Sequence, residues 1–231
     1  MLVSAIMPAL NEEEHIQQSL RSIRQNYSTE ELEIIIADGG STDRTKELIP
    51  PGITFLQTPP GRATQMNRGA AAASGAIFVF IHADTIMLAG WREEVIQTLA
   101  DPSISGGTFQ STLQPEQGFL MHWINQRDYP PIWQLMYGDQ VQFMRRETFE
   151  KIGGFPDIPL MEDVEMSRAL HKAGKITRIQ QRTFTSGRRF IENGPLRQYW
   201  HNLTFMIRYL YLGASPEKIQ SLYQSSRERS L

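Results

Sequence analysis

Residues 76–85 have the sequence Ala-Ile-Phe-Val-Phe-Ile-His-Ala-Asp-Thr, and this stretch decides the fold. Positions 77–81 form an unbroken run of β-branched and aromatic side chains, typical of a strand buried on both faces within a parallel sheet. The run ends at His82 and Asp84, and open α/β sheets bind ligands just beyond the carboxyl ends of their strands. Asp84 taken alone leaves two interpretations open. It is a ligand for Mg²⁺ or Mn²⁺ carrying a diphosphate, or it caps the next helix.

Strand and helix patterns alternate on both sides of this stretch. Further buried strands are predicted over 2–7, 32–37 and 54–57. Asn11, with Glu14 three residues later, predicts the N-terminal cap of a helix. A second helix is predicted to begin near Asp43, and others cover 62–73 and 91–99. The alternation predicts an α/β fold with a Rossmann-like, mixed and mostly parallel central sheet flanked by helices.

The pattern loosens after about residue 100. The later predicted strands cover 104–113, 138–144 and 175–181. The later predicted helices cover 119–127, 147–152, 160–171 and 195–212. A loop over 128–133 is dense in aromatic side chains, which either stack on a sugar or belong to the core. Residues after Pro216 are predicted to form a polar tail.

Composition excludes several classes of protein. The 231 residues are enough for one large domain, or for one domain with an appendage. With 23 Lys plus Arg against 25 Asp plus Glu, the chain has no nucleic-acid signature. The absence of cysteine excludes disulfides and a thiol nucleophile, and it fits a cytoplasmic protein. No stretch predicts a signal peptide or a membrane span, but the aromatic helix over 195–212 leaves peripheral attachment to the inner membrane face open.

Charged residues in two further places have both a structural and a functional interpretation. Glu162 and Asp163 begin a predicted helix, where they either complement its dipole or supply a general base with a raised pKa. Arg188 and Arg189 lie in a predicted basic turn over 186–190, either as solvated charges or as a clamp for a diphosphate. The turn over 39–43 lacks the Gly-Lys-Ser/Thr ending of a P-loop, which excludes that interpretation.

Several motifs together resemble glycosyltransferase family 2, which has the GT-A fold. They occur in the family's order over about residues 2–175, and the ordered set is far more specific than any single motif. The matching segments are 8–12 (Pro-Ala-Leu-Asn-Glu), 38–43 (Asp-Gly-Gly-Ser-Thr-Asp), 61–69, 80–84 (Phe-Ile-His-Ala-Asp), 153–155 and 162–163. The compact form with Gly-Arg-Ala-Thr-Gln-Met-Asn also resembles a small bacterial and cyanobacterial-type subgroup, some of whose members are linked to arsenosugar biosynthesis.

The resemblance implies an inverting transfer of sugar from a nucleoside-diphosphate sugar to an acceptor hydroxyl. Asp84 would hold a divalent metal, Mg²⁺ or Mn²⁺, and Asp163, beside Glu162, would be the catalytic base. The expected nucleotide-binding residues are Pro8, Ala9, Asn11, Glu12, Asp38, Gly40, Arg62, Asn67, His82, Ala83, Arg188 and Arg189. The expected GT-A domain covers 1–190, with a nucleotide-sugar half over about 1–100 and an acceptor half over about 101–190. A helical extension covers 191–231.

His82 departs from the family's usual Asp-x-Asp motif, because it replaces the first aspartate. A neutral imidazole supplies no fixed negative charge, although it can still hydrogen-bond a ribose hydroxyl or ligate the metal directly. His171 and His201 are further candidate ligands. The departure keeps a non-catalytic nucleotide-sugar binding protein as an alternative, and a nucleotidyltransferase is a third. The acceptor, whether small molecule, glycan or lipid-linked, is expected to contact 129–137 and the residues after Arg189.

Overall fold

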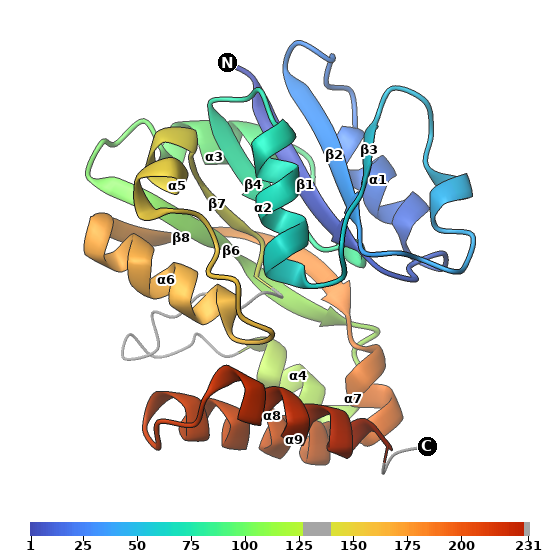
Figure 1. Ribbon diagram of the computed structural model, residues 1–231. Helices are drawn as coiled ribbons and strands as arrows, with labels where there is room; N and C mark the ends of the chain where they lie inside the picture. The colour runs from blue at the N-terminus through green and yellow to red at the C-terminus, as the bar shows by residue number, and fades with distance from the viewer. Residues whose placement is uncertain (127–139, 229–231) are drawn as a thin grey trace.

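A mixed β-sheet runs through the molecule, and helices cover both of its faces (Figure 1). The computed structural model describes residues 1–126 and 140–228, so the aromatic loop predicted over 128–133 lies outside the described residues. The strands are β1 Val3–Ala9, β2 Leu32–Asp38, β3 Thr54–Gln57, β4 Ile77–Phe80, β5 Thr85–Ile86, β6 Ile104–Gln114, β7 Gln142–Arg145 and β8 Lys175–Ser186. Their order in the eight-stranded sheet is β3-β2-β1-β4-β7-β6-β8-β5.

Strand direction divides the sheet into two parts. The four strands β3, β2, β1 and β4 are mutually parallel, whereas β7 is antiparallel to both of its neighbours. β6 and β8 are again parallel, and the short β5 pairs with β8 in the antiparallel sense. All four residues of β4 are buried between β1 and β7, as the apolar run predicts. The α/β prediction is confirmed. The carboxyl ends of β1, β2 and β4 share one edge, which brings the segments after them together.

Two apolar layers hold the helices against the sheet. The helices are α1 Ile16–Arg24, η1 Lys46–Leu48, α2 Arg62–Ala72, α3 Trp91–Thr98, α4 Gly118–Gln126, α5 Arg146–Ile152, α6 Glu162–Ala173, α7 Arg188–Asn193, α8 Pro195–Leu210 and α9 Pro216–Glu228. On one face Ile16, Leu20 and Ile23 of α1 and Trp91 of α3 pack on the strands. On the other face α2, α5 and α6 do so. The sequence predicts a thin side for α2, and a Cβ on Gly69 would lie only 2.5 Å from the Ile6 Cγ2 atom.

Near the N-terminus the helices begin later than predicted, because polar side chains that were expected to cap helices form hydrogen bonds within the loops instead. Asn11 is not a helix cap. It has a φ of 54°, and α1 begins five residues later, at Ile16. The predicted helix near Asp43 is reduced to the three residues of η1. β1 also continues through Pro8. The Ile6 carbonyl points toward β4 and accepts a hydrogen bond from Ile81 N. The backbone nitrogen of Pro8, two residues later, points the same way, but β4 has ended by then. Proline, which has no N–H to donate, is therefore tolerated at this position.

The C-terminal part holds more regular structure than the sequence predicts. β8 extends to Ser186, and α7 replaces most of the predicted basic turn. The residues predicted as a polar tail form helix α9, which lies within the helical extension predicted over 191–231. Ile219 of α9 is fully buried against Met161 and Val164 of the α6 region, and the ring of Tyr223 packs edge-on against Phe205 of α8. In the ranges 1–126 and 140–228, no helix combines the length and apolarity needed to cross a membrane.

Candidate functional site

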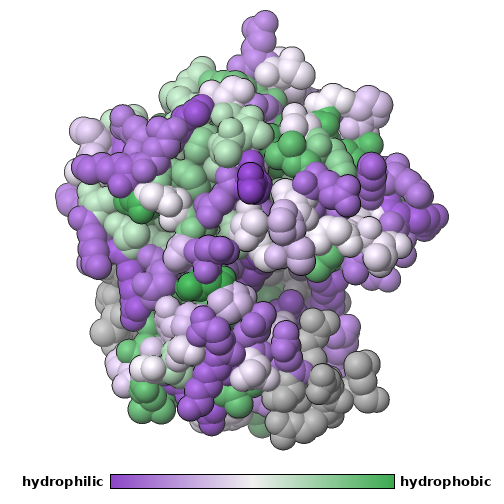
Figure 2. All heavy atoms as spheres, in the orientation of Figure 1, coloured by the Kyte–Doolittle hydropathy of each residue, from purple (hydrophilic) through white to green (hydrophobic). Residues whose placement is uncertain are grey.

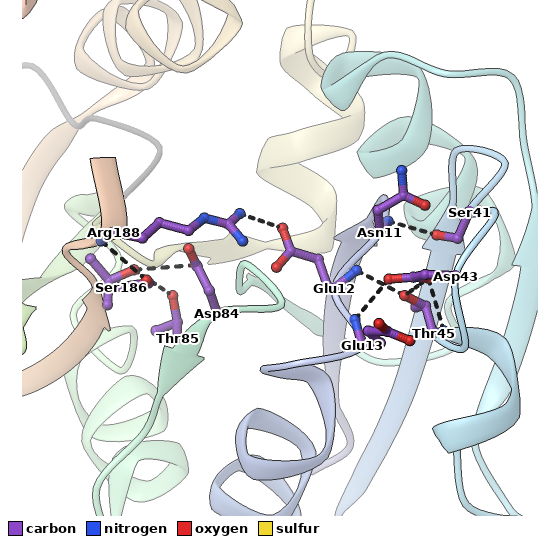
Figure 3. A network of polar contacts seen from close by, with 11 residues as sticks. Asn11, Glu12, Glu13, Ser41, Asp43, Thr45, Asp84, Thr85, Ser186 and Arg188 are labelled. Carbon is purple, nitrogen blue, oxygen red and sulfur yellow. Dashed lines mark hydrogen bonds and ion pairs between the residues drawn. The ribbon is translucent and has the colours of Figure 1, made fainter. Parts of the chain in front are cut away.

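The segments after β1 and β2 are locked together by side chain to backbone hydrogen bonds (Figure 3). Asn11 Oδ1 accepts from Thr42 N at 2.8 Å, and Ser41 Oγ accepts from Asn11 N at 2.9 Å. Thr45 Oγ1 accepts from Glu12 N at 2.8 Å, and Asp43 Oδ2 accepts from Glu13 N at 3.0 Å. These polar residues, which the sequence assigns to caps and turns, therefore fix the position of Glu12 at the edge of the sheet.

Asp38 organises the turn that follows β2. Its carboxylate is 3% exposed and accepts hydrogen bonds of 2.9 Å from both Gly40 N and Ser41 N. Gly40 has a φ of 95°, which a residue with a Cβ adopts only with strain, so the turn depends on this glycine. The structure thus gives Asp38 and Gly40 a clear role in shaping the loop, and their contact with a nucleotide base stays a prediction.

An ion pair crosses from the first loop to the C-terminal part. Arg188 Nη2 donates to Glu12 Oε1 at 2.8 Å, and the Asp84 carboxylate lies beside the Arg188 side chain (Figure 3). Burial raises the pKa of Glu12, assisted by the negative charge of Asp84, while Arg188 opposes the rise. Burial would lower the pKa of Arg188, but its hydrogen bond to Glu12 and the charges of Glu12 and Asp84 raise it. The second oxygen of Glu12, Oε2, is buried and has no hydrogen-bond partner.

Asp84 lies just past β4 and is half-buried. Its Oδ1 accepts a hydrogen bond from Thr185 Oγ1 at 3.4 Å, which links it to β8. The donor set fits a hard divalent cation, because a carboxylate is present and the partnerless Glu12 oxygen faces the same space. Across the ranges that the structure describes, no three His, Asp or Glu side chains group as a complete metal site. A metal held by Asp84 would therefore complete its shell with phosphate oxygens and water.

A pocket lies at the start of α6, and His82 is part of its lining. Its lining comes from α2, β4, the segment after β4, β7 and α6 and consists of Met66, Phe80, His82, Gln142, Glu162 and Asp163. Asp163 Oδ1 accepts from Val164 N at 2.8 Å, and Gln142 Nε2 donates to the Asp163 carbonyl at 3.4 Å. The predicted catalytic pair Glu162–Asp163 thus lies at the wall of a pocket that also contains His82.

The two acids of this pair have different surroundings. Glu162 is 1% exposed, and its Oε1 forms an ion pair of 2.8 Å with Arg62 Nε, while its Oε2 is buried without a hydrogen-bond partner. Burial raises the pKa of Glu162 to about 7, with a further contribution from the charge of Asp163, and Arg62 opposes the rise. Arg62 therefore forms an ion pair with Glu162 at the edge of the pocket.

His82 is a neutral imidazole near pH 7. Burial lowers its pKa to about 4, and the positive charge of Arg62 acts in the same direction, while Asp84 and Asp163 oppose them. The charges of both Asp84 and Asp163 act on His82, so His82 lies near both carboxylates. His171 lies in the last turn of α6, at the end opposite Asp163, and neither it nor His201 belongs to a group of potential ligands in the described ranges.

The remaining predicted contacts have mixed surroundings. Ala9 and Ala83 are buried, as is the strand that holds Pro8. Asn67 forms two hydrogen bonds with Phe155, donating to its carbonyl at 2.8 Å and accepting from its N–H at 2.9 Å, which holds the turn before α6. The Arg189 guanidinium lies over the Tyr223 ring, 5.5 Å from its centroid. A nucleotide role for these residues stays a prediction.

Two glutamines in the site region were not predicted. Gln65 Nε2 donates to the carbonyls of Ala9 and Ala37, each at 2.8 Å, and so joins the carboxyl ends of β1 and β2 to α2. Gln142 is 3% exposed and lines the pocket. The available signal for Gln142 was a polar residue directly before the apolar pair Phe143 and Met144 in a predicted strand.

Comparison with known sequences places the chain in a family. Residues 4–225 match the family described as Glycosyl transferase family 2, and the chain belongs to that family. A curated relative is "Glycosyltransferase AglE" from Haloferax volcanii, 28% identical over 171 residues, which cover 67% of this chain and 56% of the relative. The chain thus spans little more than half the length of that relative.

Solved structures share the fold. The "Mannosyltransferase PcManGT from Pyrobaculum calidifontis in complex with GDP-Man and Mn2+" aligns with a TM-score of 0.65 at 19% identity, covering 97% of this chain and 68% of that one. S. aureus TarS 1–349 in complex with UDP-GlcNAc aligns with a TM-score of 0.63 at 17% identity, covering 80% and 58%. The predicted GT-A fold is therefore confirmed.

Proposed function

We propose that the protein is an inverting glycosyltransferase that moves a sugar from a nucleoside-diphosphate sugar to an acceptor hydroxyl. One observation carries the proposal. The carboxyl edge of the sheet brings together Asp84 beside Arg188 and, in the pocket where α6 begins, His82 with Asp163, within a family 2 chain. The arrangement suits a displacement in which charge leaves on one side and a proton is lost on the other.

On the donor side, the diphosphate would bind between Glu12, Asp84 and Arg188. Arg188 already spans this space, and it would turn from Glu12 Oε1 to the phosphate oxygens, because a guanidinium matches their geometry. The loops that hold Asn11 and Asp38 would frame the nucleoside, since their backbone is fixed before any ligand binds. A divalent metal held by Asp84 would supply positive charge beside the departing diphosphate.

On the acceptor side, Asp163 would act as the general base. Inversion requires the hydroxyl to approach the anomeric carbon from the side opposite the leaving group, so its proton must be accepted there. Asp163 lines the pocket from the first turn of α6. Glu162 would position it, because its ion pair with Arg62 fixes the start of α6 against α2.

The proposal is tested first by binding and then by turnover. Calorimetric titration with UDP and with GDP, each with and without Mn²⁺, is expected to show one nucleotide binding, and more tightly with Mn²⁺. The sugar donors UDP-glucose, UDP-GlcNAc and GDP-mannose are then incubated with the protein. Release of the nucleoside diphosphate by the donor that matches the bound nucleotide supports the proposal, whether water or an added hydroxyl compound accepts the sugar.

Other outcomes would overturn it. Binding of a nucleoside diphosphate without release from any donor, across a broad set of acceptors, favours the non-catalytic binding protein instead. Formation of pyrophosphate from a sugar phosphate and a nucleoside triphosphate favours a nucleotidyltransferase. Binding of neither nucleotide, with or without Mn²⁺, removes the donor site altogether.

A further inference from the structure

An exposed apolar surface lies on the C-terminal helices, away from the site. Figure 1 shows α4, α7, α8 and α9 grouped below the sheet, at the end of the molecule opposite the N-terminus. On the face visible in Figure 2, hydrophobic side chains are interspersed with hydrophilic ones in this part. The large exposed side chains on α4, α8 and the residue after α8, here called the α4–α8 patch, are Phe119, Trp123, Leu196, Trp200, Ile207 and Tyr211.

Helix α8 has two apolar sides with different fates. Phe205, Met206, Tyr209 and Leu210 face inwards and pack around Met161, Val164 and Ile219. The outer positions 196, 200, 203, 207 and 211 recur at intervals of four, three, four and four, which at about 100° per residue forms one stripe along the helix. Leu196 is 60% exposed, Trp200 54% and Tyr211 67%, so the stripe faces solvent.

Helix α4 widens this stripe into a surface. Its inner residues Met121 and Ile124 pack with Leu113 and with Tyr199 of α8, and the Trp123 and Tyr199 rings are 6.3 Å apart. Phe119, four residues before Trp123 and therefore on the same side of α4, is 82% exposed. Soluble monomers rarely present such a contiguous group of large apolar side chains, and those that do use them for binding.

Charge identifies what the patch binds. Residues 194–212 contain Arg197, His201 and Arg208 and no Asp or Glu. These three positions recur at intervals of four and seven, so they form a line beside the apolar stripe, displaced from it by about 100° around the helix. A helix with an apolar face, interfacial tryptophan and a basic flank matches the surface of an anionic bilayer, which offers apolar chains below negative headgroups.

We infer that the α4–α8 patch seats the protein on the surface of an anionic membrane, with the basic line of α8 against the lipid headgroups. The α8 helix would lie in the plane of the interface, because its inner side remains packed on α6 and α9. The inference does not rest on the proposed transfer reaction, since it concerns binding to lipid without donor or acceptor.

Vesicle co-sedimentation of the full chain tests the inference. We expect binding to vesicles of phosphatidylcholine mixed with phosphatidylglycerol, at least about tenfold weaker binding to phosphatidylcholine alone, and weakening when salt is raised. The variant Trp200→Ser/Ile207→Ser and the variant Arg197→Glu/Arg208→Glu should each lose about tenfold or more. Their matched controls, Leu88→Ser and Arg68→Glu, change exposed residues outside the patch and should bind like the unmodified protein.

Circular dichroism and the unfolding temperature confirm that each variant is folded, and the charge variant leaves every apolar residue of the patch in place. Absence of binding to both kinds of vesicle would overturn the inference. So would unchanged binding by the folded Trp200→Ser/Ile207→Ser variant. A dimer of the unmodified protein in sedimentation velocity, dissociated by that variant and indifferent to vesicles, would assign the patch to a second copy of the chain instead.

Discussion

The loops after β1 and β2, on the proposed donor side, and the strands β6 and β8, on the proposed acceptor side, differ in how their buried polar groups are hydrogen-bonded. On the donor side, Thr45 is fully buried, and its hydroxyl accepts from Glu12 N and donates to Asp43. On the acceptor side, Thr183 of β8 is equally buried, yet its hydroxyl has no hydrogen-bond partner. Other buried polar side chains share this state there: Ser111 and Thr112 of β6 and the Oε1 atom of Gln140.

This difference indicates two stages of preparation. A buried hydroxyl without a partner costs free energy, so a protein retains it where a ligand later supplies the partner or where the cost is small. The loops after β1 and β2 have polar groups paired without a ligand, and under the proposed function this preorganisation would suit recognition of a nucleotide. In β6 and β8 the partnerless hydroxyls are buried, so they leave hydrogen-bonding capacity unused inside the protein. Two buried atoms of the segment after β1 also have no partner, His15 Nε2 and Glu12 Oε2, and Glu12 Oε2 faces the space proposed for the diphosphate and metal.

The largest expected effect tests whether chemistry belongs to the acceptor side alone. Asp163→Asn should lower kcat on the order of 10³-fold while leaving the Kd of the nucleoside diphosphate within about twofold, because a general base acts on the acceptor proton. Steady-state kinetics and calorimetry measure the two quantities. Asp101→Asn, at an exposed position before β6, serves as the control with unchanged kcat. Normal turnover by Asp163→Asn would mean that another group accepts the proton.

The next prediction concerns the donor side alone. Asp84→Asn should weaken nucleotide binding on the order of 100-fold in the presence of Mn²⁺, since an amide is a poorer ligand than a carboxylate for a hard cation. Without metal, the same substitution should change the Kd much less. Calorimetry with and without Mn²⁺ separates the two cases. An equal loss under both conditions would assign Asp84 to direct contacts rather than to metal binding.

A third prediction concerns Glu162, the buried acid beside Asp163. Burial raises the pKa of Glu162 to about 7 from its ordinary 4.5, so the folded protein binds this proton more tightly than the unfolded chain does. The resulting stability is fully present below the unfolded pKa and is lost as pH rises through the folded pKa. Relative to Glu162→Gln, the unfolding free energy should therefore fall by roughly 1.5 kcal/mol between about pH 5.5 and about pH 7.

Urea unfolding at several pH values measures this difference. The exposed Glu94→Gln is the matched control, and its unfolding free energy should stay parallel to that of the unmodified protein across the same range. If Glu162→Gln also stays parallel, the carboxyl is ionised throughout, and the ion pair with Arg62 outweighs the burial.

The smallest expected effect compares the two sides directly with one substitution. Thr45→Val should lower the unfolding free energy by about 1 kcal/mol or more, because Glu12 N and Asp43 each lose a partner. Thr183→Val has nearly the same shape and removes a hydroxyl that has no partner, so stability should be unchanged or slightly higher. Thermal unfolding compares the pair. Equal losses in both variants would show that the two regions are equally satisfied in the unliganded protein.

Much of this architecture could be predicted because it depends on local patterns. The buried strand over 77–80, its neighbours and Asp84 follow from apolar runs that end in polar residues, and Asp163 follows from paired acids at a predicted helix start. What escaped prediction depends on distant partners. Asn11 has the composition of a cap, but its partner is Thr42, thirty-one positions away. Ile219 of α9 packs on the α6 region, and the spacing of Ile219, Leu222 and Tyr223 at i, i+3 and i+4 is a short helical pattern in the predicted tail. The pairing of Arg188 with Glu12 likewise joins two residues that only the complete sheet brings together.

Helix α2 makes contact with both halves of the site. Gln65 fastens it to the ends of β1 and β2, Arg62 to Glu162, and Asn67 to Phe155. The helix therefore connects the two parts of the site. Under the proposed function, this one helix would set the separation between the bound nucleotide and the base, and a tilt of the helix would misalign both reactants at once. Insertions between the donor and acceptor segments should be tolerated wherever they leave this span unchanged, and a single residue added within it should not.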